Sequence, residues 1–121
     1  MRIYLVRHPA PDVAPGICYG RSDLALAADV AGCVADLRAL LPADAGWYSS
    51  PLQRCRLLAQ SLHASPTFDE RLQEIHFGDW EMCAWDDIDR EQIDAWAAAG
   101  PDFAPADHPV QVQRRGPGRC G

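Results

Sequence analysis

An arginine-histidine pair and a further arginine occupy positions where an anion could be bound and attacked. Arg7 and His8 follow directly on the apolar run "IYLV" at residues 3–6, and Arg54 follows "SSP" at residues 49–51. A neutral imidazole with one free ring nitrogen is a competent nucleophile near neutral pH. Guanidinium donors match phosphate oxygens, and helix N-termini attract phosphate through unpaired backbone N–H groups. Together these residues predict an anion pocket that contains an attacking group.

Each of these residues also has a simpler interpretation. An Arg-His pair at a strand end is more often a surface pair than a catalytic one, and an arginine such as Arg54 is more often a solvated helix residue. Only their joint placement at one edge of a sheet would favour the pocket, so the elements that carry them matter.

The hydrophobic pattern predicts alternating strands and helices. Residues 2–6 form an apolar run typical of a buried strand, and residues 46–49 and 67–68 are further strand candidates. Helical periodicity covers residues 27–41 and residues 84–98. Between them, a further helix is predicted to begin with Ser50 as its N-cap and Pro51 as its first helical residue. This order indicates an α/β fold with helices packed on a mainly parallel sheet, which binds ligands at the carboxyl ends of its strands.

Composition excludes several function classes. The net charge is −6 and all 11 basic residues are arginine, which argues against nucleic acid as a partner and excludes lysine-dependent chemistry. The five cysteines, at 18, 33, 55, 83 and 120, form no C-x-x-C pair, and no cluster of metal ligands is visible. We expect no metal and no cofactor. Without a signal-peptide core or an apolar run near the roughly 18 residues of a membrane helix, the chain is predicted to be cytoplasmic, with no membrane partner.

Three segments of the chain resemble the histidine phosphatase superfamily, the phosphoglycerate-mutase-like group. They are "LVRHPAPDVAPGICYGRSDLAL", "YSSPLQRCRLLAQSL" and "ERLQEIHFGDWE", and they occur in the order found in that family. The resemblance covers residues 2 to about 98 and implies a three-layer α/β/α sandwich, of which this chain would hold the N-terminal portion. The stretch "PGICYGRSDLAL" is most similar to the α-ribazole phosphatase branch, which acts in cobalamin biosynthesis.

The resemblance also implies a mechanism of phosphomonoester hydrolysis. His8 matches the histidine that takes up the phosphoryl group, and Arg7 and Arg54 match the arginines that hold its oxygens. Glu74 matches the acid that protonates the leaving oxygen and later activates water. The substrate would then be a small phosphorylated metabolite.

Three further residues are candidates for substrate binding. Arg21 and Ser22 lie in the loop that covers the pocket in relatives, so we expect contacts with substrate or phosphate. Glu81, in "GDWE", is either a substrate contact or, as we favour, a solvated loop carboxylate.

The chain departs from the family pattern at three places. Pro9 follows His8 and Met82 follows "GDWE", where glycine is usual. A second pocket histidine, in a later "H-G-G"-like motif, is absent, and His108 in "ADHPV" matches it in neither position nor neighbours.

The tail differs in composition from the rest of the chain. Residues 101–121 contain four prolines and three glycines with almost no periodic apolar positions. We expect residues 1–100 to be the N-terminal part of a histidine phosphatase domain and residues 101–121 to be disordered. We expect that the family domain is truncated and that the segment after Pro105 is an out-of-frame translation. We also expect the chain to catalyse hydrolysis slowly or not at all.

Other functions remain open. The chain could be another histidine phosphatase or a mutase that acts on a sugar phosphate or a broad set of substrates. It could also be a non-catalytic remnant that binds a phosphorylated ligand. The sequence leaves the oligomeric state unknown.

Overall fold

The structure is a computed structural model that describes residues 1–99 of the chain, in two compact units. The first unit contains residues Met1–Val13 and Asp23–Gln73, and the second contains Ala14–Ser22 and the chain from Glu74 onward. Each unit is described separately. The predicted tail at residues 101–121 lies outside the described residues.

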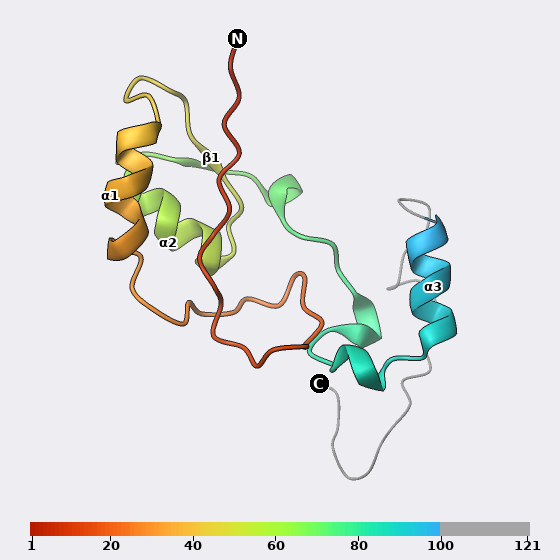
Figure 1. The fold of residues 1–121 in the computed structure, drawn as a ribbon. Coiled ribbons are helices and arrows are strands. Elements are labelled where there is room, and N and C mark those ends of the chain that lie inside the picture. Colours follow the sequence, from red (N-terminus) through yellow and green to blue (C-terminus); the bar gives the residue numbers. More distant parts are fainter. Residues whose placement is uncertain (100–121) are drawn as a thin grey trace. The chain divides into compact units, whose positions relative to one another are not determined.

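The first unit contains a strand–helix–strand motif (Figure 1). Strands β1 (Tyr48–Ser49) and β2 (Thr67–Phe68) are parallel, with Tyr48 opposite Thr67, and helix α2 (Gln53–Leu62) connects them and packs on β1. Helix α1 (Ala31–Leu40) packs on α2. Both strands and both helices were predicted, and the parallel pairing confirms the α/β class.

The start of each helix differs from the prediction. Helix α1 begins at Ala31 rather than at residue 27. At this start the Asp29 carboxylate accepts the Ala31 N–H at 3.0 Å. Helix α2 begins at Gln53, after an extended Leu52, so the expectation that Ser50 is its N-cap and Pro51 its first residue is wrong. Ser50 instead accepts the Leu52 N–H at 3.2 Å, one step before the helix.

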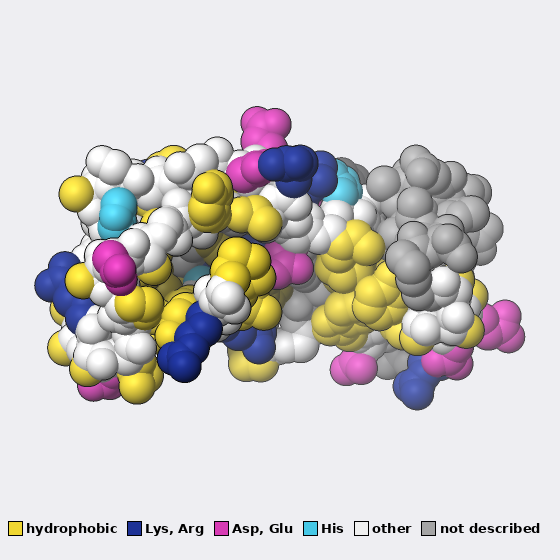
Figure 2. Space-filling model, turned by 90° about the horizontal axis from the view of Figure 1, so that it is seen from above, with side chains coloured by type: hydrophobic (Ala, Val, Ile, Leu, Met, Phe, Trp, Pro, Cys, Tyr) yellow, Lys and Arg dark blue, Asp and Glu magenta, His cyan; other side chains and the backbone are white. Residues whose placement is uncertain are grey.

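The predicted buried strand at residues 2–6 is wrong. Figure 1 shows this segment as coil, and Ile3 and Leu5 are 74% and 95% exposed. A strand requires hydrogen bonds from a neighbour, and within residues 1–99 the two strands β1 and β2 pair with each other. Figure 2 shows apolar side chains open to solvent on the face drawn.

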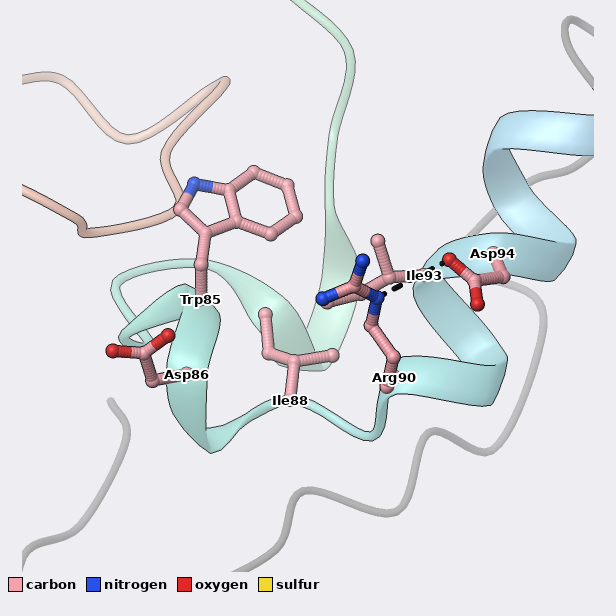
Figure 3. Close-up of a pocket in the computed structure, with 6 residues that line it drawn as sticks. All are labelled: Trp85, Asp86, Ile88, Arg90, Ile93 and Asp94. Carbon is pink, nitrogen blue, oxygen red and sulfur yellow. Dashed lines mark hydrogen bonds and ion pairs between the residues drawn. The ribbon is translucent and has the colours of Figure 1, made fainter.

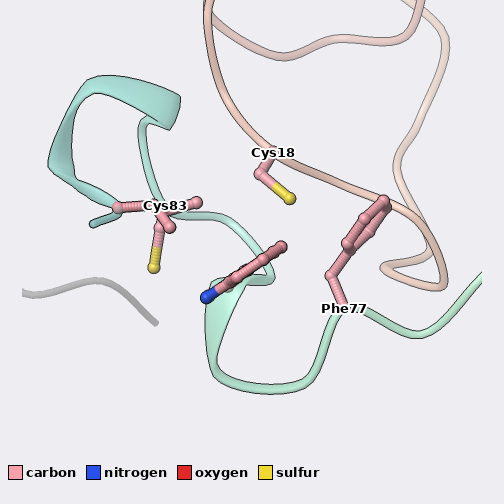
Figure 4. Close-up of a cluster of buried hydrophobic side chains, with 5 residues drawn as sticks. Cys18, Phe77 and Cys83 are labelled. Atoms are coloured by element: carbon pink, nitrogen blue, oxygen red, sulfur yellow. The ribbon is translucent and has the colours of Figure 1, made fainter. Parts of the chain in front are cut away.

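The second unit is built around an aromatic core. Figure 4 labels three side chains of this core, which consists of the buried residues Cys18, Phe77, Trp80, Cys83 and Ile88. Trp85, Ile93 and Trp96 pack against this cluster. The rings of Phe77 and Trp85 meet edge to face at 5.8 Å, a favoured aromatic geometry. Cys18 donates its N–H to the carbonyl of Cys83 at 2.7 Å, which ties residue 18 to this core.

Short helical turns frame that core. The 3₁₀ turns η2 (Gly78–Trp80) and η3 (Trp85–Asp87) precede helix α3 (Arg90–Ala99), and η1 (Glu70–Leu72) belongs to the first unit. The single helix predicted for residues 84–98 is therefore two elements. Asp89 separates them because its carboxylate accepts the Glu91 N–H at 2.9 Å and begins α3.

Met82 adopts a backbone conformation that side chains rarely take. Its φ is 64°, in the left-handed region where glycine is favoured. This is the position where the sequence departs from the glycine usual after "GDWE". Met82 therefore holds a backbone conformation that glycine adopts at lower cost.

Candidate active site

His8 is held in one tautomer by the backbone that follows it. Its Nδ1 lies 2.7 Å from the carbonyl oxygen of Pro9, and the residue is half-buried. A carbonyl oxygen only accepts hydrogen bonds, so Nδ1 carries the proton. In the neutral ring the lone pair is then on Nε2, which is the nitrogen able to act as a nucleophile. Pro9 supplies this carbonyl although it replaces the usual glycine.

Arg54 is completely buried in the first turn of α2, with an exposed fraction of 0%. The two serines that precede the helix, Ser49 and Ser50, are also buried. Arginine is rarely buried unless it is paired or hydrogen-bonded. The alternative that Arg54 is a solvated helix residue is wrong. Arg7, by contrast, is exposed in the coil that precedes His8.

The N-terminus of α2 is already partly occupied by the protein's own groups. The Gln53 N–H donates to the Asp23 carboxylate at 2.7 Å, and the Gln53 side-chain amide donates to the Asp23 carbonyl at 3.0 Å. With the Leu52 N–H directed to Ser50, these two N–H groups are taken and are not available to a ligand. The prediction missed Asp23, which lies 30 residues from Gln53 in the sequence.

Glu74 is exposed in the second unit. Its backbone carbonyl accepts a hydrogen bond from Arg21 Nε at 3.2 Å. The predicted acid and the predicted substrate-binding arginine are therefore neighbours, joined by a hydrogen bond between segments 53 residues apart.

Glu81 is the most heavily hydrogen-bonded carboxylate of the predicted site. It accepts the Gly20 N–H at 3.1 Å, the Arg21 N–H at 2.8 Å, the Ser22 hydroxyl at 2.8 Å and the Phe77 N–H at 3.2 Å. The interpretation of Glu81 as a solvated loop carboxylate is therefore wrong.

These contacts decide the charge of Glu81. Burial of the carboxylate opposes ionisation, but the hydrogen bonds from Gly20, Ser22, Phe77 and Arg21 outweigh it. The pKa of Glu81 is consequently lowered from its ordinary value. Glu81 is a carboxylate near neutral pH, and four donors of its own chain converge on it.

The predicted residues are divided between the two units. Arg7, His8 and Arg54 belong to the first, and Glu74, Arg21, Ser22 and Glu81 to the second. Within the second unit the structure brings its four residues together through hydrogen bonds. The roles of all seven residues, and the convergence of the two groups on one phosphate, stay predictions.

A separate pocket of about 360 Å³ lies in the second unit (Figure 3). The described residues that line it are Trp85, Asp86, Ile88, Arg90, Ile93 and Asp94. Its one arginine, Arg90, pairs with Asp94 at 3.4 Å. Two aspartates against one paired arginine do not suit an anion, and none of the predicted site residues is among those six.

Two negative findings apply to the described part of the chain. Within residues 1–99, no group of three or more histidine, cysteine, aspartate or glutamate side chains is arranged to hold a metal ion. None of the helices in these residues is long and apolar enough to cross a membrane.

The first unit thus joins a parallel strand pair and its helices to a half-buried His8, predicted to be the nucleophile, and a fully buried Arg54. The sequence model of the histidine phosphatase superfamily (branch 1) matches residues 3–117, nearly the whole chain. The chain belongs to this superfamily, and its fold is the phosphoglycerate-mutase-like α/β fold that the sequence predicts.

Two of the similar proteins with solved structures come from Thermus thermophilus. The protein TTHB049 is 28% identical with a TM-score of 0.67, and the match covers 89% of this chain and 62% of that one. A phosphoglycerate mutase is 25% identical with a TM-score of 0.64, covering 88% and 61%. The chain thus spans about 62% of the length of the first of these relatives. No curated protein matches the chain.

Proposed function

We propose that this chain carries the phosphoryl-accepting half of a phosphomonoesterase that works through a phosphohistidine at His8. The observation that carries the proposal is the hydrogen bond from His8 Nδ1 to the Pro9 carbonyl at 2.7 Å, which leaves Nε2 as the nucleophile. Membership of the histidine phosphatase superfamily and the burial of Arg54 support it.

In the first step, His8 Nε2 attacks the phosphorus atom of the ester. The N–P bond forms, the P–O bond to the leaving group breaks, and Glu74 donates a proton to the departing oxygen. Arg7 and Arg54 hold the equatorial oxygens, where charge must be stabilised during phosphoryl transfer. In the second step Glu74 takes a proton from water, whose oxygen attacks phosphorus and breaks the N–P bond. Phosphate leaves and His8 is restored.

The proposed substrate is α-ribazole 5′-phosphate, and the proposed setting is cobalamin biosynthesis in the cytoplasm. The support for this substrate is the resemblance of "PGICYGRSDLAL" to the α-ribazole phosphatase branch. In the structure Arg21 and Ser22, within this stretch, are held in place by hydrogen bonds to Glu74 and Glu81. That order suits a loop that contacts a substrate.

Phosphoryl transfer between two positions of one small phosphorylated metabolite is the second candidate. The similarity to a phosphoglycerate mutase at a TM-score of 0.64 favours it. The two activities differ in their product, because a phosphatase releases inorganic phosphate and a mutase returns an isomeric ester. A chromatographic assay of the products separates them.

Trapping of the phosphoenzyme tests the proposal directly. The 121-residue chain is mixed with a ³²P-labelled phosphomonoester, quenched in alkali, which preserves phosphohistidine, and mapped by peptide analysis. We expect the label on His8, its loss in His8→Asn, and its retention in the control His63→Gln. The assay needs one transfer rather than turnover. Label on another residue, or a folded chain that takes up none, would contradict the mechanism and favour a non-catalytic phospho-ligand protein.

A further inference from the structure

One side chain of the second unit connects segments that are about 60 residues apart in the sequence. The Glu81 carboxylate accepts hydrogen bonds from three consecutive residues of one loop, Gly20, Arg21 and Ser22. It also accepts the N–H of Phe77, which follows Glu74 by three residues. Four donors of neutral groups converge on one negative charge, and hydrogen bonds to an ionised acceptor are about twice as strong as those between neutral groups.

The loop is packed directly on the segment that carries Glu74. A Cβ atom placed on Gly20 would overlap the backbone carbonyl oxygen of Ile75 and would lie 2.9 Å from Phe77 Cδ2. Gly20 is buried, and its neighbour Arg21 donates to the Glu74 carbonyl. Only glycine allows this approach, so residues 20–22 and 74–77 share one fixed arrangement.

We propose that Glu81 is a positioning residue, whose carboxylate locks residues 20–22 against residues 74–77 and so fixes Glu74 for proton donation to the leaving group. This inference rests on the proposed function, because it assigns Glu81 to the acid step of that reaction. Glu81 itself does not donate the proton. Both of its oxygens are engaged by the chain, and its lowered pKa makes it a weaker proton donor than an ordinary carboxylic acid.

The hydrogen bonds from residues 20–22 and Phe77 to the Glu81 carboxylate, which we call the lock, can be measured without turnover in the wild-type chain and in variants. Protonation of Glu81 weakens all its hydrogen bonds at once, so the amide signals of Gly20, Arg21 and Phe77 should shift together in an NMR pH titration. They should do so at one midpoint below the usual range of a glutamate. Independent midpoints, or amides that do not respond, would overturn the lock.

Amide hydrogen exchange in Glu81→Gln provides the second measurement. A glutamine presents N–H₂ where the carboxylate accepted two donors, so exchange at Gly20, Arg21 and Phe77 should accelerate by about 10-fold or more. The control Glu91→Gln removes an exposed carboxylate from α3 in the same unit and should leave these amides unchanged. Unchanged protection in folded Glu81→Gln would overturn the lock.

The dependence on leaving group tests whether the lock serves Glu74. An alkyl phosphate has a basic leaving group that needs a proton, whereas p-nitrophenol leaves without one. The quantity to compare is kcat/KM, which reports the transfer to His8, because the later hydrolysis of the phosphohistidine also uses Glu74 and is common to both esters. Because a general acid contributes about 100-fold or more, Glu81→Gln should lower kcat/KM on the alkyl ester by about 10- to 100-fold. On p-nitrophenyl phosphate the loss should be only a few-fold. Equal losses on both esters would mean a merely structural role and would refute the positioning of Glu74.

His8→Asn separates failure of this inference from failure of the proposed function. Turnover that survives in His8→Asn rejects the phosphohistidine mechanism, while the exchange data still decide whether Glu81 forms the lock. Turnover that is lost in His8→Asn but equal for wild type and Glu81→Gln on both esters rejects the inference alone.

Discussion

Three glycines of this chain provide a comparison in which one chemical change has three different expected effects. Gly20 has an ordinary backbone conformation, but a Cβ there would overlap the Ile75 carbonyl oxygen and lie 3.1 Å from Glu81 Oε1. Gly16 has open space around it but a φ of +80°. Gly32 lies in α1 with neither obstacle. Alanine therefore meets a steric clash at the first site, backbone strain at the second, and neither at the third.

The magnitudes follow from these environments. In Gly20→Ala the loop must move away from residue 75, which weakens three hydrogen bonds to a charged acceptor. At about 1.5–3 kcal/mol for each intact bond, partial loss lowers the free energy of unfolding by about 3 kcal/mol. In Gly16→Ala the strain of about 1–2 kcal/mol is partly offset by the smaller entropy of the unfolded chain, leaving about 1 kcal/mol. Gly32→Ala should raise stability by about 0.5–1 kcal/mol.

Urea unfolding followed by tryptophan fluorescence and circular dichroism measures all three. Trp80, Trp85 and Trp96 report on the core of the second unit, and the helical circular dichroism signal includes α1. Thermal midpoints should follow the same order, since about 1 kcal/mol shifts the Tm of a domain this size by roughly 4–8 °C. A loss in Gly20→Ala no larger than that in Gly16→Ala would show that residues 20–22 do not pack on residue 75 as described.

Three further predictions concern single side chains. Asp23→Ala should lower the free energy of unfolding by about 1 kcal/mol in urea titrations, because the Gln53 N–H at the start of α2 loses its acceptor, whereas Asp23→Asn keeps an oxygen there and should lose less. The lowered folded-state pKa of Glu81 means that its contribution to stability is present above the ordinary carboxyl pKa of 4.5 and is lost as the pH falls through the lower folded value. Melting curves from pH 7 downward should therefore fall less steeply in Glu81→Gln, and parallel curves would contradict this. Burial, with a smaller effect of the Glu81 charge, raises the pKa of the Cys18 thiol to about 12, so at pH 8 iodoacetamide should label the half-buried Cys33 before Cys18 in a mass-spectrometric time course.

Features that depend on local sequence were predictable. The 3.6-residue periodicity of residues 27–41 located α1, although Asp29 sets its start four residues later. The run after Ser49 located α2, and short apolar runs located β1 and β2. These elements follow from the side chains that they contain, so composition and spacing alone indicate them.

Features that depend on distant partners were not predictable. Residues 2–6 have the composition of a strand, but pairing needs a neighbour that no local pattern supplies, and the segment is coil. The contacts of Asp23 with Gln53 and of Glu81 with Gly20 join residues 30 and 61 positions apart. The sequence around a single acidic residue in a loop does not indicate which distant group donates a hydrogen bond to it. The buried Arg54 was predicted for the site by resemblance, whereas its type and spacing alone favoured a solvated residue.

The exposed apolar coil at the N-terminus should make self-association of this protein depend on its concentration. Ile3, Tyr4, Leu5 and Val6 are at least 38% exposed, and this segment has the β-forming composition of an edge strand. Such a segment can pair with its counterpart in another molecule, and collisions between molecules become more frequent as the solution is concentrated. We therefore expect light scattering to show intermolecular β-pairing and aggregation that increase with protein concentration.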